Sequence, residues 1–148
     1  FMLRLLAGTT GLDIPPSNWL LMCGLLLTLF LGFSKRRAEM MLMDEAGGAH
    51  RKVLDLYSPA LLDQFITITG ACAVVAYSLY TVDEDTVRIH GTADLIYTLP
   101  FVLYGLFRYL YMLHRRGGGG DPSHDLFRDP HLIVAMAGWL AVTVFLLR

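Results

Sequence analysis

The chain of 148 residues is 55% hydrophobic and only 17% charged, and its mean hydropathy is +0.51, which excludes an ordinary water-soluble domain. Its formal net charge of -1 provides no bulk attraction to nucleic acid, so nucleic acid is not an expected partner. The composition therefore predicts an integral membrane protein whose main surroundings are the lipid bilayer.

Runs of about 20 apolar residues, the length that crosses a bilayer core of about 30 Å, predict the membrane spans. We expect an all-α fold, a polytopic transmembrane helix bundle that occupies residues 1–148 as one domain. It contains a partial first span and four full spans, predicted at residues 1–12, 17–33, 60–82, 93–114 and 131–147. Because the chain begins at Phe1 without an initiator methionine, we interpret it as a fragment whose first helix is incomplete.

Proline and hydroxyl side chains indicate where these spans begin. A pair of prolines precedes Ser17, so they end one helix while Ser17 or Asn18 can cap the next. Ser58 and Pro59 provide a cap and a first turn for the span at 60–82 in the same way. The span at 93–114 contains Pro100, which neighbouring helices can accommodate by satisfying the freed carbonyl group.

Lysine and arginine alternate between the predicted connections, and these residues accumulate on the cytoplasmic side of membrane proteins. The connections after residues 33 and 114 are basic, whereas the one after residue 82 has only Arg88. The basic positions are Lys35, Arg36, Arg37, Arg51, Lys52, Arg115, Arg116 and Arg128. We therefore expect the loops at 35–59 and 115–130 to face the cytoplasm and the C-terminus to lie outside.

The segment at residues 32–57 is too long for a tight turn and is amphipathic, so we expect an interfacial helical hairpin there. On a helix, Lys35 and Arg36 lie within about one turn of Glu39, and all three side chains can point into one cavity. One carboxylate with two cations suits a magnesium-bound pyrophosphate. The alternative is that Lys35, Arg36 and Arg37 only set the membrane topology, with Glu39 in an intrahelical salt bridge.

Two charged residues inside predicted spans need partners, because a charge is costly within a bilayer. Asp63, near the start of the span at 60–82, indicates a functional or paired role. Arg108 lies in an aromatic run and is either salt-bridged to another span or directed at a phosphate. The polar segment at 120–130 could add groups at the same membrane face, although its Gly and Pro content also fits a plain turn.

Several segments, taken in order, resemble the C-terminal half of UbiA-type membrane prenyltransferases. They are GFSKRRAEM, RKVLDLYSPALLDQF and YGLFRYLYMLHRRGGGGDPSHDLFRDP. Within that superfamily the chain is most similar to the decaprenyl-phosphate phosphoribosyltransferases, and the resemblance covers essentially the whole chain. Its best motif is the K-R-x-x-E run at Lys35 with the later Y-S-P at Tyr57.

The resemblance implies a bundle of nine spans around a cavity, in which this chain joins a missing N-terminal half. It also implies transfer of 5-phosphoribose from magnesium-bound phosphoribosyl pyrophosphate to a polyprenyl (decaprenyl) phosphate, with release of pyrophosphate. The reaction would take place in the bacterial plasma membrane and feed cell-wall arabinan synthesis. By resemblance, Lys35 and Arg36 would bind donor phosphate and Glu39 would help to hold Mg²⁺. The further substrate-contact candidates are Tyr57, Lys52 and Arg108.

The chain departs from the wider superfamily pattern in two ways. The main aspartate-rich magnesium motif belongs to the N-terminal half, so we expect this chain alone to be inactive. A DxxxD motif typical of aromatic prenyltransferases is also missing from the loop around Asp44, which favours a phosphoribosyl donor. Two alternatives remain open. One is a UbiA-type prenyltransferase acting on an aromatic, quinone or tetrapyrrole acceptor, and the other is a small non-enzymatic membrane protein.

Overall fold

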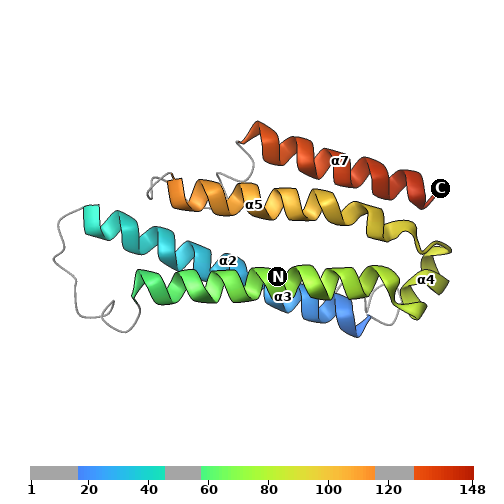
Figure 1. Cartoon of the computed structure of the whole chain (residues 1–148), viewed down its shortest axis with the longest axis horizontal. Helices are drawn as coiled ribbons and strands as arrows, with labels where there is room; N and C mark the ends of the chain where they lie inside the picture. Colours follow the sequence, from blue (N-terminus) through green and yellow to red (C-terminus); the bar gives the residue numbers. More distant parts are fainter. Residues whose placement is uncertain (1–16, 46–57, 116–128) are drawn as a thin grey trace, which may run out of the picture.

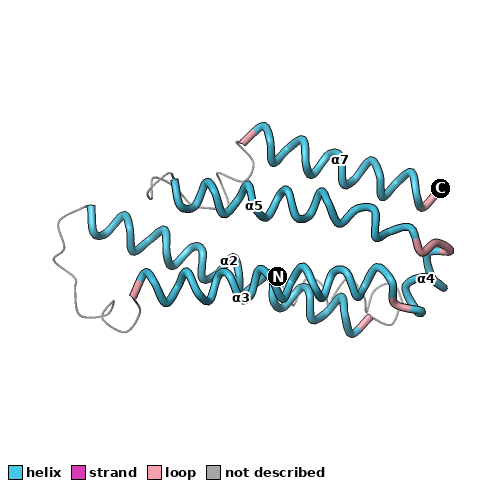
Figure 2. Tube along the Cα trace, viewed as in Figure 1, coloured by secondary structure: helices cyan, strands magenta, loops and turns pink. Residues whose placement is uncertain are grey.

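The computed structural model describes residues 17–45, 58–115 and 129–148, and within these ranges every regular element is helical (Figures 1 and 2). This confirms the predicted all-α class. The elements are α2 (Asn18–Glu45), α3 (Pro59–Val82), α4 (Glu84–His90), the 3-10 helix η1 (Asp94–Thr98), α5 (Leu99–Arg115) and α7 (Pro130–Leu146). The partial span expected at residues 1–12 lies outside the described residues.

Three stretches are long and apolar enough to cross a membrane: Asn18–Leu42, Pro59–Val82 and Asp94–Arg115. The fourth apolar helix, α7, has 17 residues, which is the short end of the range for a membrane span. Large apolar side chains remain exposed on these helices, with Phe145 78% and Val134 69% accessible. Such surfaces fit a lipid environment, and the structure supports a helical membrane protein.

Helix α2 corrects the prediction of a span at 17–33 followed by a separate interfacial hairpin. It continues without a break to Glu45, which extends it about 18 Å beyond residue 33. The reason is local, because residues 34–45 contain strong helix formers and neither Gly nor Pro. Ser34 also stays within the helix by donating its hydroxyl to the Phe30 carbonyl oxygen at 2.8 Å. Residues 34–45 therefore extend the spanning helix, whereas the rest of the predicted hairpin, residues 46–57, lies outside the described residues.

Helix α3 begins as its capping residues predict. The Ser58 hydroxyl accepts a hydrogen bond from the Leu61 amide at 3.2 Å, and Pro59 occupies the first turn. After Val82 the chain forms the short helix α4. Acidic residues lie in its first turn and basic residues in its last, which complements the helix dipole, and it ends at Gly91 with a φ of 71°.

The span predicted at 93–114 is built in two parts, because it starts as the 3-10 helix η1 and becomes α5 at Leu99. Pro100 therefore lies in the first turn of α5, where its missing amide hydrogen costs no intrahelical bond. The sequence reading placed this proline inside a continuous span. The tighter turn of η1 lets the chain enter α5 from α4 without a long loop.

The helices pack as two antiparallel pairs, α2 with α3 and α5 with α7, and α3 also contacts α5 (Figure 1). The core of α2, α3 and α5 consists of Phe30, Ile66 and Tyr109, all at most 5% exposed. The rings of Phe30 and Tyr109 are 5.4 Å apart between centroids, in a tilted arrangement. Gly70 lets α3 approach α2, since a Cβ there would lie 3.2 Å from the Phe30 ring.

Polar contacts and a glycine hold α7 against the rest of the bundle. The Trp139 indole donates to the Tyr77 hydroxyl at 2.9 Å, and that hydroxyl lies 2.6 Å from the Thr98 hydroxyl. This chain of contacts joins α7, α3 and η1. Gly138 faces the Phe101 ring so closely that an added Cβ would lie 2.6 Å from its Cε1 atom. The close approach of α7 to α5 therefore depends on a residue without a side chain.

Gly138→Ala is expected to destabilise the full-length protein by about 1–3 kcal/mol, because the methyl group forces Phe101 or α7 to shift. The measurement is thermal unfolding of purified protein in detergent. Gly105→Ala is the matched control, since it lies in the neighbouring helix and an added Cβ meets nothing within 4 Å. Equal melting temperatures for the two variants would contradict the close packing of α5 and α7.

Candidate functional site

Most of the charged side chains discussed below lie toward one end of the bundle. The C-terminal end of α2, the first turn of α3, the last turn of α5 and the first turn of α7 share this end, which we call the charged end (Figure 1). The opposite end carries α4 and η1. The connections predicted to share a membrane side, those after α2 and after α5, therefore do leave the bundle at the same end.

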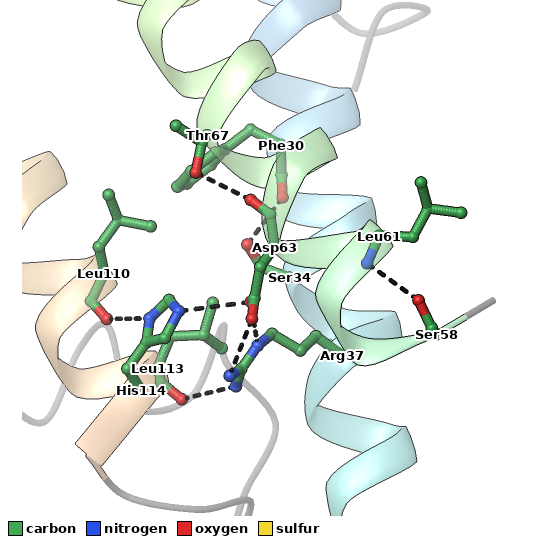
Figure 3. Close-up of polar contacts among 10 residues, drawn as sticks. All are labelled: Phe30, Ser34, Arg37, Ser58, Leu61, Asp63, Thr67, Leu110, Leu113 and His114. Carbon is green, nitrogen blue, oxygen red and sulfur yellow. Dashed lines mark hydrogen bonds and ion pairs between the residues drawn. The ribbon is translucent and has the colours of Figure 1, made fainter.

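A buried arginine joins three helices at the charged end (Figure 3). Arg37 of α2 is 8% exposed, and its Nε and Nη2 groups donate to the two carboxylate oxygens of Asp63 on α3. Its Nη1 group donates to the carbonyl oxygen of Leu113 on α5 at 3.2 Å. That carbonyl belongs to the last turn of α5, where intrahelical donors run out, so Arg37 satisfies it from another helix.

His114 completes this cluster from α5. Its Nδ1 atom is 2.8 Å from the Leu110 carbonyl oxygen, and its Nε2 atom is 3.3 Å from Asp63 Oδ1. Both partner atoms are oxygen acceptors, so each ring nitrogen of His114 faces an oxygen, one on its own helix and one on α3. We call the group formed by Arg37, Asp63, Leu113 and His114 the Arg37 clasp.

The contacts of the Arg37 clasp test two expectations from the sequence, one for Asp63 and one for Arg37. The paired role expected for Asp63 is confirmed by its contacts with Arg37 and His114. The interpretation of Arg37 as only a topology-setting surface charge is wrong, because its side chain is 10% exposed and fully engaged with other helices. Sequence spacing gave no signal of this, since the partners lie 26 and 76 residues away along the chain.

The residues predicted to hold a metal-bound diphosphate are Lys35, Arg36 and Glu39, and they lie on α2, the same helix as Arg37. The buried positions Phe30, Ser34 and Arg37 form the inward face of this helix, whereas Lys35 and Arg36 are exposed. These two cations therefore stand apart from the clasp.

Among the predicted site residues, the structure joins Arg36 to Glu39. Arg36 Nη1 lies 3.1 Å from Glu39 Oε2, with the side chains 74% and 41% exposed. Such an exposed pair one turn apart contributes about 0–1 kcal/mol, so it leaves both side chains available to a stronger ligand. Tyr57 and Lys52 fall outside the described residues.

Arg108 is the other cation that the sequence singled out. Its Nε and Nη2 groups donate to Asp129 Oδ2 at 3.2 and 2.8 Å, which confirms the salt-bridge interpretation of this residue. Asp129 Oδ1 accepts from the amides of His131 and Leu132 at 2.8 and 3.4 Å, so the same carboxylate caps α7. The hydrogen bond from Arg108 holds the pKa of Asp129 below its ordinary value.

The sequence reading missed this role of Asp129. A usable signal was present, because an Asp followed by a Pro marks the start of a helix, with the aspartate as cap and the proline in the first turn. The segment was interpreted as a possible plain turn instead. Recognising the cap would have placed a carboxylate at the first turn of the last helix, within reach of a neighbouring span.

The fold and this charged end describe a helical membrane protein, and comparison with known proteins adds a family resemblance. The chain is 28% identical over 145 residues to the decaprenyl-phosphate phosphoribosyltransferase of Mycolicibacterium smegmatis, covering 95% of this chain and 46% of that protein. It is 28% identical over 141 residues to that of Mycobacterium tuberculosis and 31% identical over 141 residues to that of Corynebacterium glutamicum.

These matches confirm the resemblance inferred from the motifs. Coverage of this chain is 95% for the latter two relatives as well, but only 45% and 42% of their own lengths. The chain therefore spans about half the length of the curated relatives it matches. No protein-family model and no solved structure matches the chain.

Replacing Asp63 with Ala in the full-length protein should lower the free energy of unfolding by about 1–3 kcal/mol, because the Arg37 guanidinium loses its carboxylate partner. The expected cost is below the roughly 3–5 kcal/mol of a fully buried pair, since the Asp63 side chain is 35% exposed. Denaturant unfolding in detergent measures it. The double variant Arg37→Met with Asp63→Leu should recover part of the loss, because neither charge is then left unpaired.

Arg88→Met is the matched control for this prediction. Arg88 and Asp85 form an ion pair within α4, at the other end of the bundle, with side chains 80% and 71% exposed. Its loss should change the free energy of unfolding by at most about 0.5 kcal/mol. If Asp63→Ala is as mild as Arg88→Met, the clasp does not hold the three helices together.

The Arg108–Asp129 pair predicts a specific acid sensitivity. Because the pKa of Asp129 is lowered in the folded protein, its stabilising contribution is complete above about pH 4, the ordinary carboxyl value, and is lost as the pH falls through the lower folded value. Melting temperature measured between neutral pH and pH 3 should show this loss. Asp129→Asn, which keeps a capping side chain but no charge, should remove that part of the pH dependence.

Proposed function

We propose that the chain forms part of a membrane phosphoribosyltransferase that moves 5-phosphoribose from phosphoribosyl pyrophosphate to a polyprenyl phosphate, most simply decaprenyl phosphate. The observation that carries the proposal is the similarity over 95% of the chain to relatives whose names state this activity. The helical, apolar architecture is compatible with a substrate that resides in the bilayer. The full enzyme needs the further length that the relatives possess.

In the proposed reaction, the negative charge that must be stabilised develops on the leaving group. A phosphate oxygen of the lipid attacks the anomeric carbon of the ribose, the bond from that carbon to the pyrophosphate oxygen breaks, and pyrophosphate leaves with the electron pair. Negative charge therefore grows on pyrophosphate in the transition state, and cations placed there lower the barrier. Lys35 and Arg36 are exposed cations that directly precede Arg37 on α2 and do not belong to the Arg37 clasp.

Magnesium fits this proposal as a companion of the diphosphate. Among the described residues no group of three His, Cys, Asp or Glu side chains could hold a metal, so a site built from these residues alone is not supported. Mg²⁺ commonly uses one or two carboxylates together with substrate phosphates, and Glu39 can supply one of them. The ion would neutralise charge on the leaving pyrophosphate. The Arg36–Glu39 pair would hold the carboxylate and one donor-binding cation side by side.

The setting of the enzyme is part of the same proposal. The protein would lie in a bacterial plasma membrane as one portion of a nine-span UbiA-type bundle, with the charged end toward the cytoplasm. The basic connections at this end support the orientation, since lysine and arginine are retained on the cytoplasmic side. The lipid-linked ribose phosphate would serve as a precursor of cell-wall arabinan.

Lys35→Ala in the full-length enzyme is expected to lower the rate of transfer by about 10²–10³, the effect of losing one group that stabilises transition-state charge (about 2.7–4 kcal/mol). Glu39→Ala should give a loss of similar size that extra Mg²⁺ partly reverses. The assay incubates labelled phosphoribosyl pyrophosphate with decaprenyl phosphate and measures lipid-linked label.

Arg88→Ala is the control for the transfer assay, because it removes an exposed cation from the opposite end of the bundle. It should leave the rate unchanged. No lipid-linked label with the wild-type enzyme would overturn the proposed function. Full activity of both Lys35→Ala and Glu39→Ala would overturn only the assignment of the donor site to α2.

A further inference from the structure

One face of α5 carries three aromatic and two cationic side chains. Tyr104, Phe107 and Tyr111 are 49%, 64% and 49% exposed, although each belongs to a membrane-length helix. Arg108 and Arg115 share that face, because residues three, four and seven positions apart align along a helix. We call these five residues the α5 stripe. The packing of α5 against α7 and α3 does not bury its aromatic side chains.

The two arginines of the stripe both contact one tyrosine ring. The guanidinium carbons of Arg108 and Arg115 lie 5.4 and 5.5 Å from the centroid of the Tyr111 ring. These distances are within the range of cation–π attraction, so Tyr111 restrains both guanidinium groups on one helix face. A restrained guanidinium loses less conformational freedom when it binds an anion.

The charge balance of the two arginines differs. Arg108 is already neutralised by Asp129, at 2.8 Å. Arg115 is exposed, and among the described residues no carboxylate lies within salt-bridge distance of it. Of the two arginines of the α5 stripe, Arg115 is therefore the one whose positive charge no described carboxylate neutralises, and it can bind an external anion.

The position of the stripe relates it to the membrane. Arg115 is the last residue of the apolar stretch Asp94–Arg115, which is long enough to cross a bilayer, and it lies in the last turn of α5 at the charged end. Tyr104 lies 11 residues earlier, which is about 16 Å deeper along the helix axis. The exposed cation at the end of α5 is thus followed, deeper along the same helix, by the exposed aromatic side chains of the α5 stripe.

We propose that the α5 stripe is a binding surface for a polyprenyl phosphate. Arg115 would bind the phosphate through its planar fork of donors, and Tyr111, Phe107 and Tyr104 would contact the first isoprene units of the chain. We choose this occupant because its charge is confined to one phosphate and its apolar part is a single chain. These two parts match Arg115 and the row of three exposed aromatic side chains that precedes it on α5. The inference rests on the proposed function and specifies where its lipid substrate would dock.

The competing occupants differ in chemistry and are separated by the test. A free phosphate would use Arg115 but not the aromatic track. Bulk acidic phospholipid would attract a snorkelling Arg115 without dependence on Tyr111. Contact with another protein surface would cover the stripe and leave no lipid-dependent signal.

The test is equilibrium binding of decaprenyl phosphate to the full-length protein in phosphatidylcholine nanodiscs, followed by native mass spectrometry. Arg115→Gln should raise the Kd roughly tenfold, which corresponds to about 1.4 kcal/mol. Tyr111→Leu should raise it roughly threefold through loss of the cation–π contacts. Arg88→Gln, an exposed cation on α4, is the matched control and should leave the Kd unchanged.

Three further probes identify the occupant. Uncharged decaprenol should bind weakly and without dependence on Arg115, inorganic phosphate should not compete, and phosphatidylglycerol binding should be the same in all variants. Equal weakening of phosphatidylglycerol and decaprenyl phosphate by Arg115→Gln would overturn the proposal in favour of general lipid attraction. An unchanged Kd for decaprenyl phosphate in Arg115→Gln and Tyr111→Leu would overturn it outright.

A second measurement on the unaltered protein guards against a variant that fails to fold. A diazirine-bearing polyprenyl phosphate should cross-link to residues 104–115 on illumination, and cross-links confined to other helices would overturn the proposal. Binding is measured without turnover, so its failure is distinct from failure of the proposed function. An enzyme that transfers phosphoribose but shows no dependence on the stripe refutes the stripe, whereas stripe-dependent binding without transfer refutes the enzyme assignment.

Discussion

The buried guanidinium of Arg37 is the constraint on which the arrangement of α2, α3 and α5 depends. A cation removed from water must have its donors satisfied, because desolvation costs several kcal/mol when they are not. Asp63 provides both carboxylate oxygens and Leu113 provides a terminal carbonyl group, each from a different helix. Sliding any of these helices by one turn would separate the partners by about 5.4 Å, so the clasp fixes their register.

The inward direction of Arg37 also determines what its neighbours on α2 can do. Successive helical residues are rotated by about 100°, so an inward Arg37 leaves Lys35 and Arg36 exposed. The same K-R-R run thus supplies one buried structural cation and two exposed cations, of which Arg36 pairs with Glu39 at the surface. The proposed donor-binding cations are held in place through the backbone of a helix that the clasp anchors.

The carboxylates of Asp63 and Asp129 at the charged end form their contacts with other residues of the bundle. Asp63 serves Arg37 and His114, and Asp129 serves Arg108 while capping α7. Each of these carboxylates has more than one donor, as a charge near a membrane requires. The exposed cations Lys35 and Arg115 lie outside these pairs on separate helices. Two anionic groups, a diphosphate and a lipid phosphate, could therefore be held by two different helices at the same end.

The sequence by itself determined the all-α membrane class, the start of α3 at its serine and proline, and the family resemblance, because hydropathy and capping are local properties. It also showed that Asp63 and Arg108 needed partners, since a charge in an apolar run is costly whatever the fold. Only the tertiary structure decided which partners those were and which of three adjacent cations is buried. Contacts between residues 21 to 76 positions apart depend on how helices dock, and no local pattern records that.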